Sequence, residues 1–345
     1  MCKFTYLSEK TVVSKSASGK PRYDVERILC DCKGQPLKCQ IIREANTFIE
    51  KIRKYLKLKK VCNNIKRLRR EIVVCQHPYS NQYKFGLQKA LLQATENNKL
   101  IFIIHDVEFI RAFETEEKKK HEIEILNSAS VIISHNQFMT EELKRNGVTN
   151  PKFVNLEIFD YLLDDIPNNT HNYGRSVVYA GNLAKAPFLD KLEKTKLGFD
   201  LILYGINYTE LNNSEIKYMG ARSPEELVSE LTQSFGLIWD SETVDGCTGN
   251  IGEYTRYNNP HKLSLYLVAG MPVIVWAESA IAKFVVENKV GFTINSLGDI
   301  SKRLDSLTQA EYGEYVKNAN ALKEKLSKGY FMKKAIMQAI DICKE

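Results

Sequence analysis

A lysine stands at the start of a predicted helix, where it could bind a phosphate group. Pro260 suits the first helical position, Asn258 or Asn259 could cap the helix, and Lys262 falls in its first turn. The free N–H groups and partial positive charge of a helix start favour an anion, and the lysine adds a full charge. The segment predicts a diphosphate site, although a capped helix with a solvated lysine fits the same residues equally well.

His105 and Asp106 form a second candidate, directly after the apolar run 99–104. Polar residues at the carboxyl end of a central strand lie where open α/β sheets bind ligands. Either side chain could take the proton of an acceptor hydroxyl during group transfer with inversion. The alternative is that Asp106 caps the following helix while His105 is satisfied at the sheet edge, and both interpretations can hold at once.

Three more groups follow predicted strands in the second half of the chain. Gly181 and Asn182 form a turn in which the glycine would let a nucleotide approach the backbone, and Lys185 could reach a phosphate. Tyr204 could stack on the base of a nucleotide or belong to the core. Asp240 ends another strand at a ligand-facing position.

These positions require parallel sheets, and the chain has the alternation of strands and helices that forms them. The segment from Asp164 to Gly174, with Pro167 and three asparagines, is typical of a linker, so a boundary is expected near residue 165. The predicted strands are 3–7, 38–42, 71–75, 99–104, 130–134, 148–154, 176–180, 199–204, 216–219, 235–239 and 273–276. The pattern predicts an α/β fold of two doubly wound domains. The mixed-charge stretch Glu114–Glu124 is expected to be exposed.

A basic helix is predicted from Asn46 to Arg70. Between Lys51 and Arg70 there are ten lysines or arginines and no acid. Apolar residues recur at three- and four-residue steps: Phe48, Ile52, Tyr55, Leu58, Cys62, Ile65 and Leu68. The helix fits contact with an anionic membrane surface, or else a solvated face. Nucleic acid is not an expected partner, because no binding module is present.

The composition, 43% hydrophobic and 26% charged over 345 residues, is typical of a soluble globular protein. No stretch is typical of a signal peptide or a membrane span, so the expected location is cytoplasmic, or peripheral on the inner face of the cell membrane.

The cysteines do not have the spacing of a zinc site. The close groupings are Cys30-x-Cys32 with Cys39, and Cys75-x-His77. Neither a metal nor another cofactor is expected.

Four segments, in order, resemble bacterial GT-B glycosyltransferases related to β-1,6-galactofuranosyltransferases and to the streptococcal adhesin glucosyltransferase called glucosyltransferase 3. They are FIIHDV (102–107), YAGNL (179–183), GLIWD (236–240) and NPHKLSLYLVAGMPVIV (259–275). The resemblance extends from about residue 70 to the C-terminus.

The resemblance implies two Rossmann-like domains facing a cleft. Residues 1–165 would bind the acceptor, residues 166–329 the nucleotide sugar, and residues 330–345 would form a helix that crosses back to the first domain. It implies transfer of a hexosyl group, galactofuranose or glucose, from a UDP-sugar to a lipid-linked or protein-linked saccharide acceptor in surface polysaccharide or glycoprotein assembly. It also implies metal-independent chemistry and makes a homo-oligomer plausible.

The residues described above and the resemblance together give the candidate site residues. Catalysis is expected at His105 and Asp106. Ser16, Ser18 and Gly19 are expected to form an acceptor-side loop, since the resemblance implies that this loop faces the cleft, or else a mobile turn. The donor is expected to contact Gly181, Asn182, Lys185, Tyr204, Asp240, Tyr257, Asn258, Asn259, Lys262 and Leu263.

One position departs from the related pattern. Many retaining GT-B enzymes carry two glutamates eight positions apart here, whereas His261 stands eight after Glu253. This argues against that branch and leaves the stereochemistry open. A non-catalytic sugar-binding or nucleotide-binding subunit is the alternative function, but the charged groups Asp106, Asp240 and Lys262 favour an enzyme.

Overall fold

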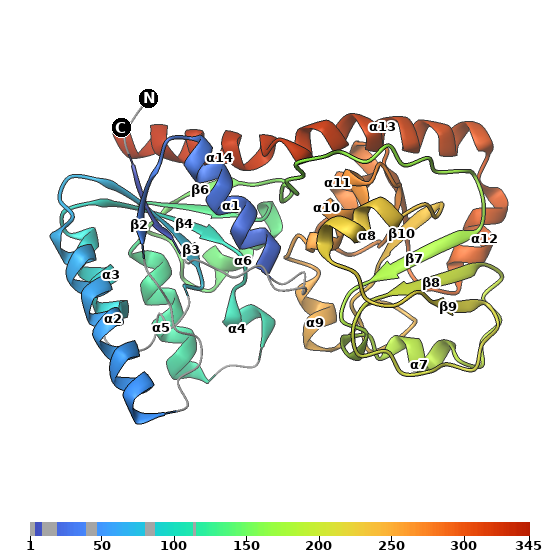
Figure 1. Cartoon of the computed structure of the whole chain (residues 1–345), viewed down its shortest axis with the longest axis horizontal. Coiled ribbons are helices and arrows are strands. Elements are labelled where there is room, and N and C mark those ends of the chain that lie inside the picture. The colour runs from blue at the N-terminus through green and yellow to red at the C-terminus, as the bar shows by residue number, and fades with distance from the viewer. Residues whose placement is uncertain (1–3, 9–18, 39–46, 80–86, 113–114) are drawn as a thin grey trace. The chain divides into compact units, whose positions relative to one another are not determined.

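The computed structural model describes residues 4–8, 19–38, 47–79, 87–112 and 115–345. The chain forms two compact units, each built on its own six-stranded parallel sheet (Figure 1). Unit 1 comprises Met1–Val13, Arg22–Leu156 and Met332–Glu345, and unit 2 comprises Ser14–Pro21 and Glu157–Phe331. Two Rossmann-like α/β units are therefore confirmed, while the roles predicted for the two domains stay predictions.

The sheet of unit 1 has the strand order β2-β1-β3-β4-β5-β6. Its strands are β1 (Thr5–Ser8), β2 (Gln35–Lys38), β3 (Ile72–His77), β4 (Lys99–Ile104), β5 (Val131–Ser134) and β6 (Lys152–Asn155). The central strands are continuous apolar runs because helices cover both faces of the sheet. The order reverses between β1 and β3, and such a switch point is where doubly wound sheets bind ligands.

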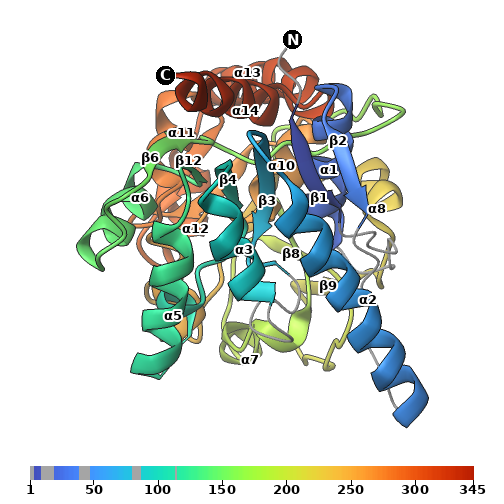
Figure 2. The ribbon, with the colours of Figure 1, turned by 90° about the vertical axis from the view of Figure 1, so that its left-hand side faces the viewer.

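Helices α2, α3 and α5 lie along one face of this sheet, and α1 and α14 lie on the other (Figures 1 and 2). The helices of the unit are α1 (Lys20–Asp31), α2 (Phe48–Arg67), α3 (Leu87–Thr95), α4 (Glu108–Arg111), α5 (Glu116–Asn127), α6 (Gln137–Arg145) and most of α14 (Tyr330–Lys344). Lys333 of α14 lies 3.4 Å from Asp31 of α1. The predicted return of the last helix to the first unit is confirmed.

The sheet of unit 2 has the order β12-β11-β10-β7-β8-β9. Its strands are β7 (Ser176–Ala180), β8 (Asp200–Tyr204), β9 (Ile216–Tyr218), β10 (Phe235–Ile238), β11 (Val273–Trp276) and β12 (Gly291–Ile294). Its helices are the 3₁₀ turn η2 (Leu183–Lys185), α7 (Phe188–Leu192), α8 (Pro224–Glu230), α9 (Gly249–Tyr254), α10 (His261–Val268), α11 (Ala282–Glu287), α12 (Asp299–Ser306) and α13 (Gln309–Ser327). The switch point lies between β7 and β10.

Close packing at that switch point depends on a glycine. A Cβ at Gly236 in β10 would lie 2.3 Å from the Tyr266 ring of α10, so only glycine lets the helix approach the strand. The Tyr266 hydroxyl accepts a hydrogen bond from the Ala180 backbone N–H, at 2.9 Å. Tyr266 thereby ties α10 to the carboxyl end of β7, where the candidate donor residues lie.

Two connections of unit 2 contain only short helices. Helix α9 lies in the polar segment 241–256 between β10 and α10, and η2 and the five-residue α7 lie between β7 and β8. Before α9, the hydroxyl groups of Ser241, Thr243 and Thr248 form hydrogen bonds within the turn, and such bonds compete with regular helix.

Candidate active site

Three of the candidate donor residues, Gly181, Asp240 and Lys262, gather at the carboxyl ends of β7 and β10. Lys262, the second residue of α10, forms an ion pair with Asp240, which follows β10. The Lys262 ammonium lies 3.3 Å from the Tyr179 hydroxyl and 4.7 Å from the centre of the Tyr179 ring. A Cβ at position 181 would lie 3.2 Å from Lys262 Cε, so Gly181 also belongs to this group. We call Tyr179, Gly181, Asp240 and Lys262 the lysine cluster.

The electrostatics of the lysine cluster follow from its burial. Burial raises the pKa of the Tyr179 hydroxyl well above its ordinary value, and Asp240 raises it further. Burial, reinforced by Asp240, also raises the pKa of the Cys247 thiol to about 12. Tyr179 and Cys247 are therefore neutral, so the charges of the cluster are those of Asp240 and Lys262.

The start of α10 differs from the prediction. Pro260 itself is the N-cap, and no side chain caps the helix, so the predicted cap by Asn258 or Asn259 is wrong. Asn259 instead donates to the backbone carbonyl of Glu157, at 2.8 Å, because its amide is buried against that segment. Leu263 is fully buried, and Tyr257 and Asn258 are partly buried.

The remaining donor candidates have separate surroundings. Asn182 accepts from the backbone N–H of Ala184 at 3.2 Å and from the amide of Asn207 at 2.9 Å, so it orders the turn after β7. Lys185 is exposed at the end of η2. Tyr204 is buried, with the Arg222 guanidinium 6.0 Å from its ring centre. Within the described part of the chain, none of these three forms a hydrogen bond or an ion pair with Lys262, whose partners are Tyr179 and Asp240.

His261 stands where many retaining GT-B enzymes carry the second of two glutamates. Its ring stacks on Tyr161, with centroids 5.1 Å apart. Burial, reinforced by the charge of Lys20, lowers the pKa of His261 to about 3. His261 is therefore neutral at physiological pH, unlike a glutamate at this position.

In unit 1, His105 and Asp106 lie at the carboxyl end of β4, as predicted. His105 Nε2 lies 2.6 Å from Gln76 Oε1, and the His105 backbone N–H donates to the His77 carbonyl at 2.7 Å. Asp106 forms an ion pair with Arg111 at 3.0 Å. The alternative that Asp106 caps the next helix is wrong, because Val107 is the N-cap of α4.

The protonation of Asp106 is shifted toward the acid form. Burial raises the pKa of its carboxyl group above the ordinary value and outweighs the opposing effects of Arg111, Arg22 and His77. Burial also raises the pKa of the neighbouring Glu108. A carboxylate with a raised pKa holds a proton more strongly, which suits a general base.

Glu122 is a buried residue of this region that the sequence prediction missed. Only 1% of it is exposed, although the mixed-charge stretch around it was predicted to be exposed. Its carboxylate accepts from His77 Nε2 at 2.8 Å and from the backbone N–H groups of Glu108 and Phe109 at 3.2 and 3.0 Å. Glu122 thus caps α4 from a different helix, where Val107 offers no side-chain acceptor.

The position of Glu122 in α5 gave a signal that could have identified it. Ile125 and Leu126 lie three and four residues further on, and both are fully buried. Residues at these spacings share a helix face, so the charged stretch is interrupted on its inner side. Through Glu122, the end of β3 and the start of α4 are fixed on either side of Asp106.

The acceptor-side loop is largely outside the described residues. Ser16 and Ser18 fall outside them, and Gly19 is partly buried directly before α1.

Across the described segments, no group of three His, Cys, Asp or Glu side chains is placed to hold a metal ion. Among the same residues, no helix is both long enough and apolar enough to cross a membrane.

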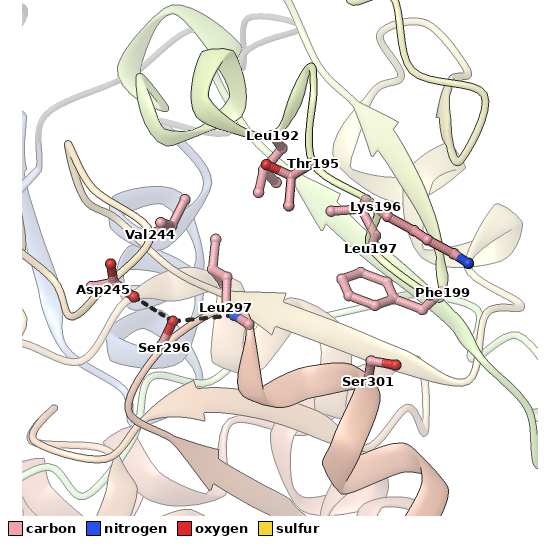
Figure 3. A pocket seen from close by; sticks show the side chains of 12 residues that line it. Leu192, Thr195, Lys196, Leu197, Phe199, Val244, Asp245, Ser296, Leu297 and Ser301 are labelled. Atoms are coloured by element: carbon pink, nitrogen blue, oxygen red, sulfur yellow. Dashed lines mark hydrogen bonds between the residues drawn. The ribbon is translucent and has the colours of Figure 1, made fainter.

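Unit 2 also has a pocket of about 340 Å³ away from the lysine cluster (Figure 3). Apolar side chains such as Leu197, Phe199 and Leu297 line it, and the Ser296 hydroxyl donates to Asp245 Oδ1 at 2.6 Å on its wall. None of the predicted donor residues lines this pocket.

Comparison with known proteins identifies the family. Residues 5–158 match the family described as "Glucosyltransferase 3-like, N-terminal domain", and residues 177–339 match "Glucosyltransferase 3-like, C-terminal domain". The chain is 33% identical over 250 residues to the β-1,6-galactofuranosyltransferase WbbI of Escherichia coli K12, covering 70% of this chain and 72% of that protein. The chain belongs to the glucosyltransferase 3-like family of glycosyltransferases.

Other relatives agree with this assignment. Glucosyltransferase 3 of Streptococcus gordonii is 28% identical over 277 residues, which cover 78% of this chain and 79% of that one. Among solved structures, sucrose-phosphate synthase from Thermosynechococcus elongatus matches with a TM-score of 0.62 at 14% identity, covering 99% and 98% of the two chains. The lipopolysaccharide galactosyltransferase WaaB matches with a TM-score of 0.61 at 12% identity, covering 98% and 99%. The fold of this glucosyltransferase 3-like enzyme is GT-B.

Proposed function

We propose that this glycosyltransferase moves a hexosyl group, galactofuranose or glucose, from a UDP-sugar to a saccharide acceptor without a metal ion. The observation that carries the proposal is the lysine cluster at the switch point of unit 2, where Lys262 stands at the start of α10 beside Gly181. The names of two relatives, a β-1,6-galactofuranosyltransferase and a glucosyltransferase, support the two candidate sugars. A structural neighbour with a TM-score of 0.57, HepE from Anabaena, was solved with UDP and with UDP-glucose.

Donor binding would break the Asp240–Lys262 ion pair, and the diphosphate would replace Asp240 as the partner of Lys262. Lys262 and Asp240 keep 18% and 19% of their side chains exposed, so a ligand can reach both. A diphosphate carries more negative charge than one carboxylate, so it would draw the Lys262 ammonium away from Asp240. Asp240 would then accept hydrogen bonds from hydroxyl groups of the donor. With Lys262 and the helix start meeting the diphosphate charge, a metal ion would not be needed.

The chemical step follows from these roles. The acceptor oxygen forms a bond to the anomeric carbon of the sugar, and the bond between that carbon and the diphosphate oxygen breaks. Asp106 takes the proton of the acceptor hydroxyl, and Lys262 stabilises the charge on the departing UDP. His105, held against Gln76, would orient the acceptor. This assignment applies to transfer with inversion.

The acceptor would be a lipid-linked or protein-linked saccharide, used in surface polysaccharide or glycoprotein assembly. The proposal includes a cytoplasmic location, with the protein peripheral on the inner face of the cell membrane, and self-association into a homo-oligomer. The name of one structural neighbour, a lipopolysaccharide outer core galactosyltransferase, supports a saccharide acceptor of this class.

The test is a transfer assay that measures UDP release with and without a saccharide acceptor. The purified enzyme is given UDP-galactofuranose, UDP-glucose or ADP-glucose, in EDTA and in Mg²⁺. The proposal predicts that one of the UDP-sugars releases UDP only when the acceptor is present, at the same rate in EDTA and in Mg²⁺. ADP-glucose should release no ADP. Activity only with Mg²⁺, or only with the ADP donor, would contradict it. UDP binding without transfer to any acceptor tested would favour the non-catalytic alternative.

A further inference from the structure

Helix α2 divides into two halves with different surroundings. In its C-terminal half, Val61, Cys62 and Ile65 are buried, and the helix packs beside α3. In its N-terminal half the large apolar side chains are 44% to 78% exposed; they are Phe48, Ile49, Ile52, Tyr55 and Leu56. The apolar side chains predicted along the whole helix are therefore buried in its C-terminal half and exposed in its N-terminal half.

The exposed apolar side chains form one face of the helix. At about 100° per residue they fall within an arc of about 120°, centred on Ile52. At the same spacing the buried Val61, Cys62 and Ile65 point about 180°, about 80° and about 140° away from that centre, which is about 135° on average. The exposed face is thus directed away from the sheet, and Figure 2 shows the N-terminal end of α2 extending beyond the neighbouring helices. We call these exposed residues the α2 apolar face.

Basic side chains surround the α2 apolar face. Lys51, Arg53 and Lys57 are exposed in the same half of the helix, and Lys59 and Lys60 are exposed just beyond its midpoint. The one acid of α2 is Glu50, and it accepts from the Thr47 backbone N–H at 3.0 Å in a capping box at the helix start. Lys51, Arg53, Lys59 and Lys60 have no ion-pair partner in the described segments. The surface is therefore both apolar and cationic.

We propose that the N-terminal half of α2 inserts into the headgroup region of an anionic lipid bilayer. A bilayer supplies both requirements of this surface, because the acyl boundary accepts the apolar face while lipid phosphates pair with the flanking cations. A second copy of the chain fits less well. A two-fold interface would place the basic residues of two identical helices against one another, with no acid between Lys51 and Arg70 to compensate.

The test is co-sedimentation of the full chain with lipid vesicles. One set contains equal parts of phosphatidylcholine and phosphatidylglycerol, and the other contains phosphatidylcholine alone. The Arg53→Gln/Lys60→Gln double variant removes two flanking cations, and Ile52→Ser/Leu56→Ser removes two apolar side chains. The matched controls are Lys302→Gln/Lys317→Gln and Val286→Ser, at positions that are exposed elsewhere.

The wild-type chain is expected to bind the anionic vesicles and not the neutral ones. Each removed cation should weaken binding by about fivefold, so about 25-fold for the pair. The apolar double variant should lose about tenfold, because less apolar area enters the interface. Both control variants should bind like the wild type. These sites are exposed, so the variants are expected to fold, and circular dichroism checks this.

Three results would overturn the inference. They are equal binding to both kinds of vesicle, wild-type binding by both α2 variants, or no vesicle binding at all. If, in addition, Ile52→Ser/Leu56→Ser converts an oligomer into a monomer in size-exclusion chromatography with light scattering, a second copy covers the α2 apolar face. Vesicle binding is measured without sugar transfer, so the outcome is independent of the proposed donor.

Discussion

The carboxyl ends of β4 and β10 each carry an aspartate that pairs with a basic side chain. The two pairs differ in how far apart the partners lie in the sequence and in how deeply they are buried. Asp106 pairs with Arg111 from the next helix, and their side chains are 35% and 41% exposed. Asp240 pairs with Lys262 across 22 residues, and both are less than 20% exposed. Water screens the first pair more strongly, so Asp106 can change partners at little cost. The second pair is shielded, so displacing Asp240 requires a ligand of higher charge.

This difference suggests a division of chemical work. A weakly held carboxylate with a raised pKa is suited to accept a proton, whereas a shielded lysine is suited to bind an anion tightly. Substitutions in unit 1 should therefore affect turnover, and substitutions in the lysine cluster should affect donor binding.

The largest expected effect is that of Asp106→Asn. The amide cannot take the acceptor proton, so kcat should fall by about 10² to 10⁴-fold. Calorimetry should show unchanged UDP affinity, because the lysine cluster is intact. In the wild type, kcat/KM should fall as the pH drops through the raised pKa of Asp106, starting above the ordinary carboxyl range. The control is Asp165→Asn, an exposed aspartate. Full activity of Asp106→Asn would show that Asp106 is not the general base.

A smaller effect is expected for Glu122→Gln. The amide can accept with only one of its two terminal atoms, so one contact to His77 or to the start of α4 is lost. We expect kcat to fall by about tenfold, from loss of one such buried contact, with the KM of the donor unchanged. Glu124→Gln, two residues away on the exposed face, should behave as wild type. If Glu122→Gln lowers the melting temperature but leaves kcat unchanged, Glu122 is only a helix cap.

The smallest expected effect concerns stability in acid. His261 has a pKa of about 3 in the folded chain and about 6.5 when unfolded, so protonation favours the unfolded state. The free energy of unfolding should therefore fall by about 1 kcal/mol per pH unit between about pH 6 and pH 4 because of this residue. His261→Phe keeps an aromatic ring beside Tyr161 and should remove that contribution in urea unfolding. The exposed His121→Phe is the control, and an unchanged pH slope in His261→Phe would refute the assignment.

The fold was largely predictable from the sequence because buried parallel strands are continuous apolar runs. The candidate donor residues Gly181, Asp240 and Lys262 could be placed together for the same reason, since the carboxyl ends of parallel strands share one edge. The pairing of Lys262 with Asp240 was not predicted, because it depends on how closely α10 packs on the sheet. That approach is permitted by Gly236 and fixed by Tyr266.

Other features could not be predicted from local pattern. A charged stretch normally forms a solvated face, so the burial of Glu122 depends on His77 and the start of α4, which are distant in sequence. Apolar residues recur along both halves of α2, and which of them are buried depends on the side of the helix that packs on the rest of unit 1.

The most direct test of the central claim is calorimetric titration of UDP into the wild-type enzyme and Lys262→Ala, in buffer containing EDTA. The account predicts that the wild type binds UDP without metal and that Lys262→Ala weakens binding by about 10- to 100-fold, the loss of one charge-assisted contact to phosphate. The exposed Lys283→Ala should bind like the wild type. Equal UDP affinity in Lys262→Ala and the wild type would contradict the placement of the diphosphate at the start of α10.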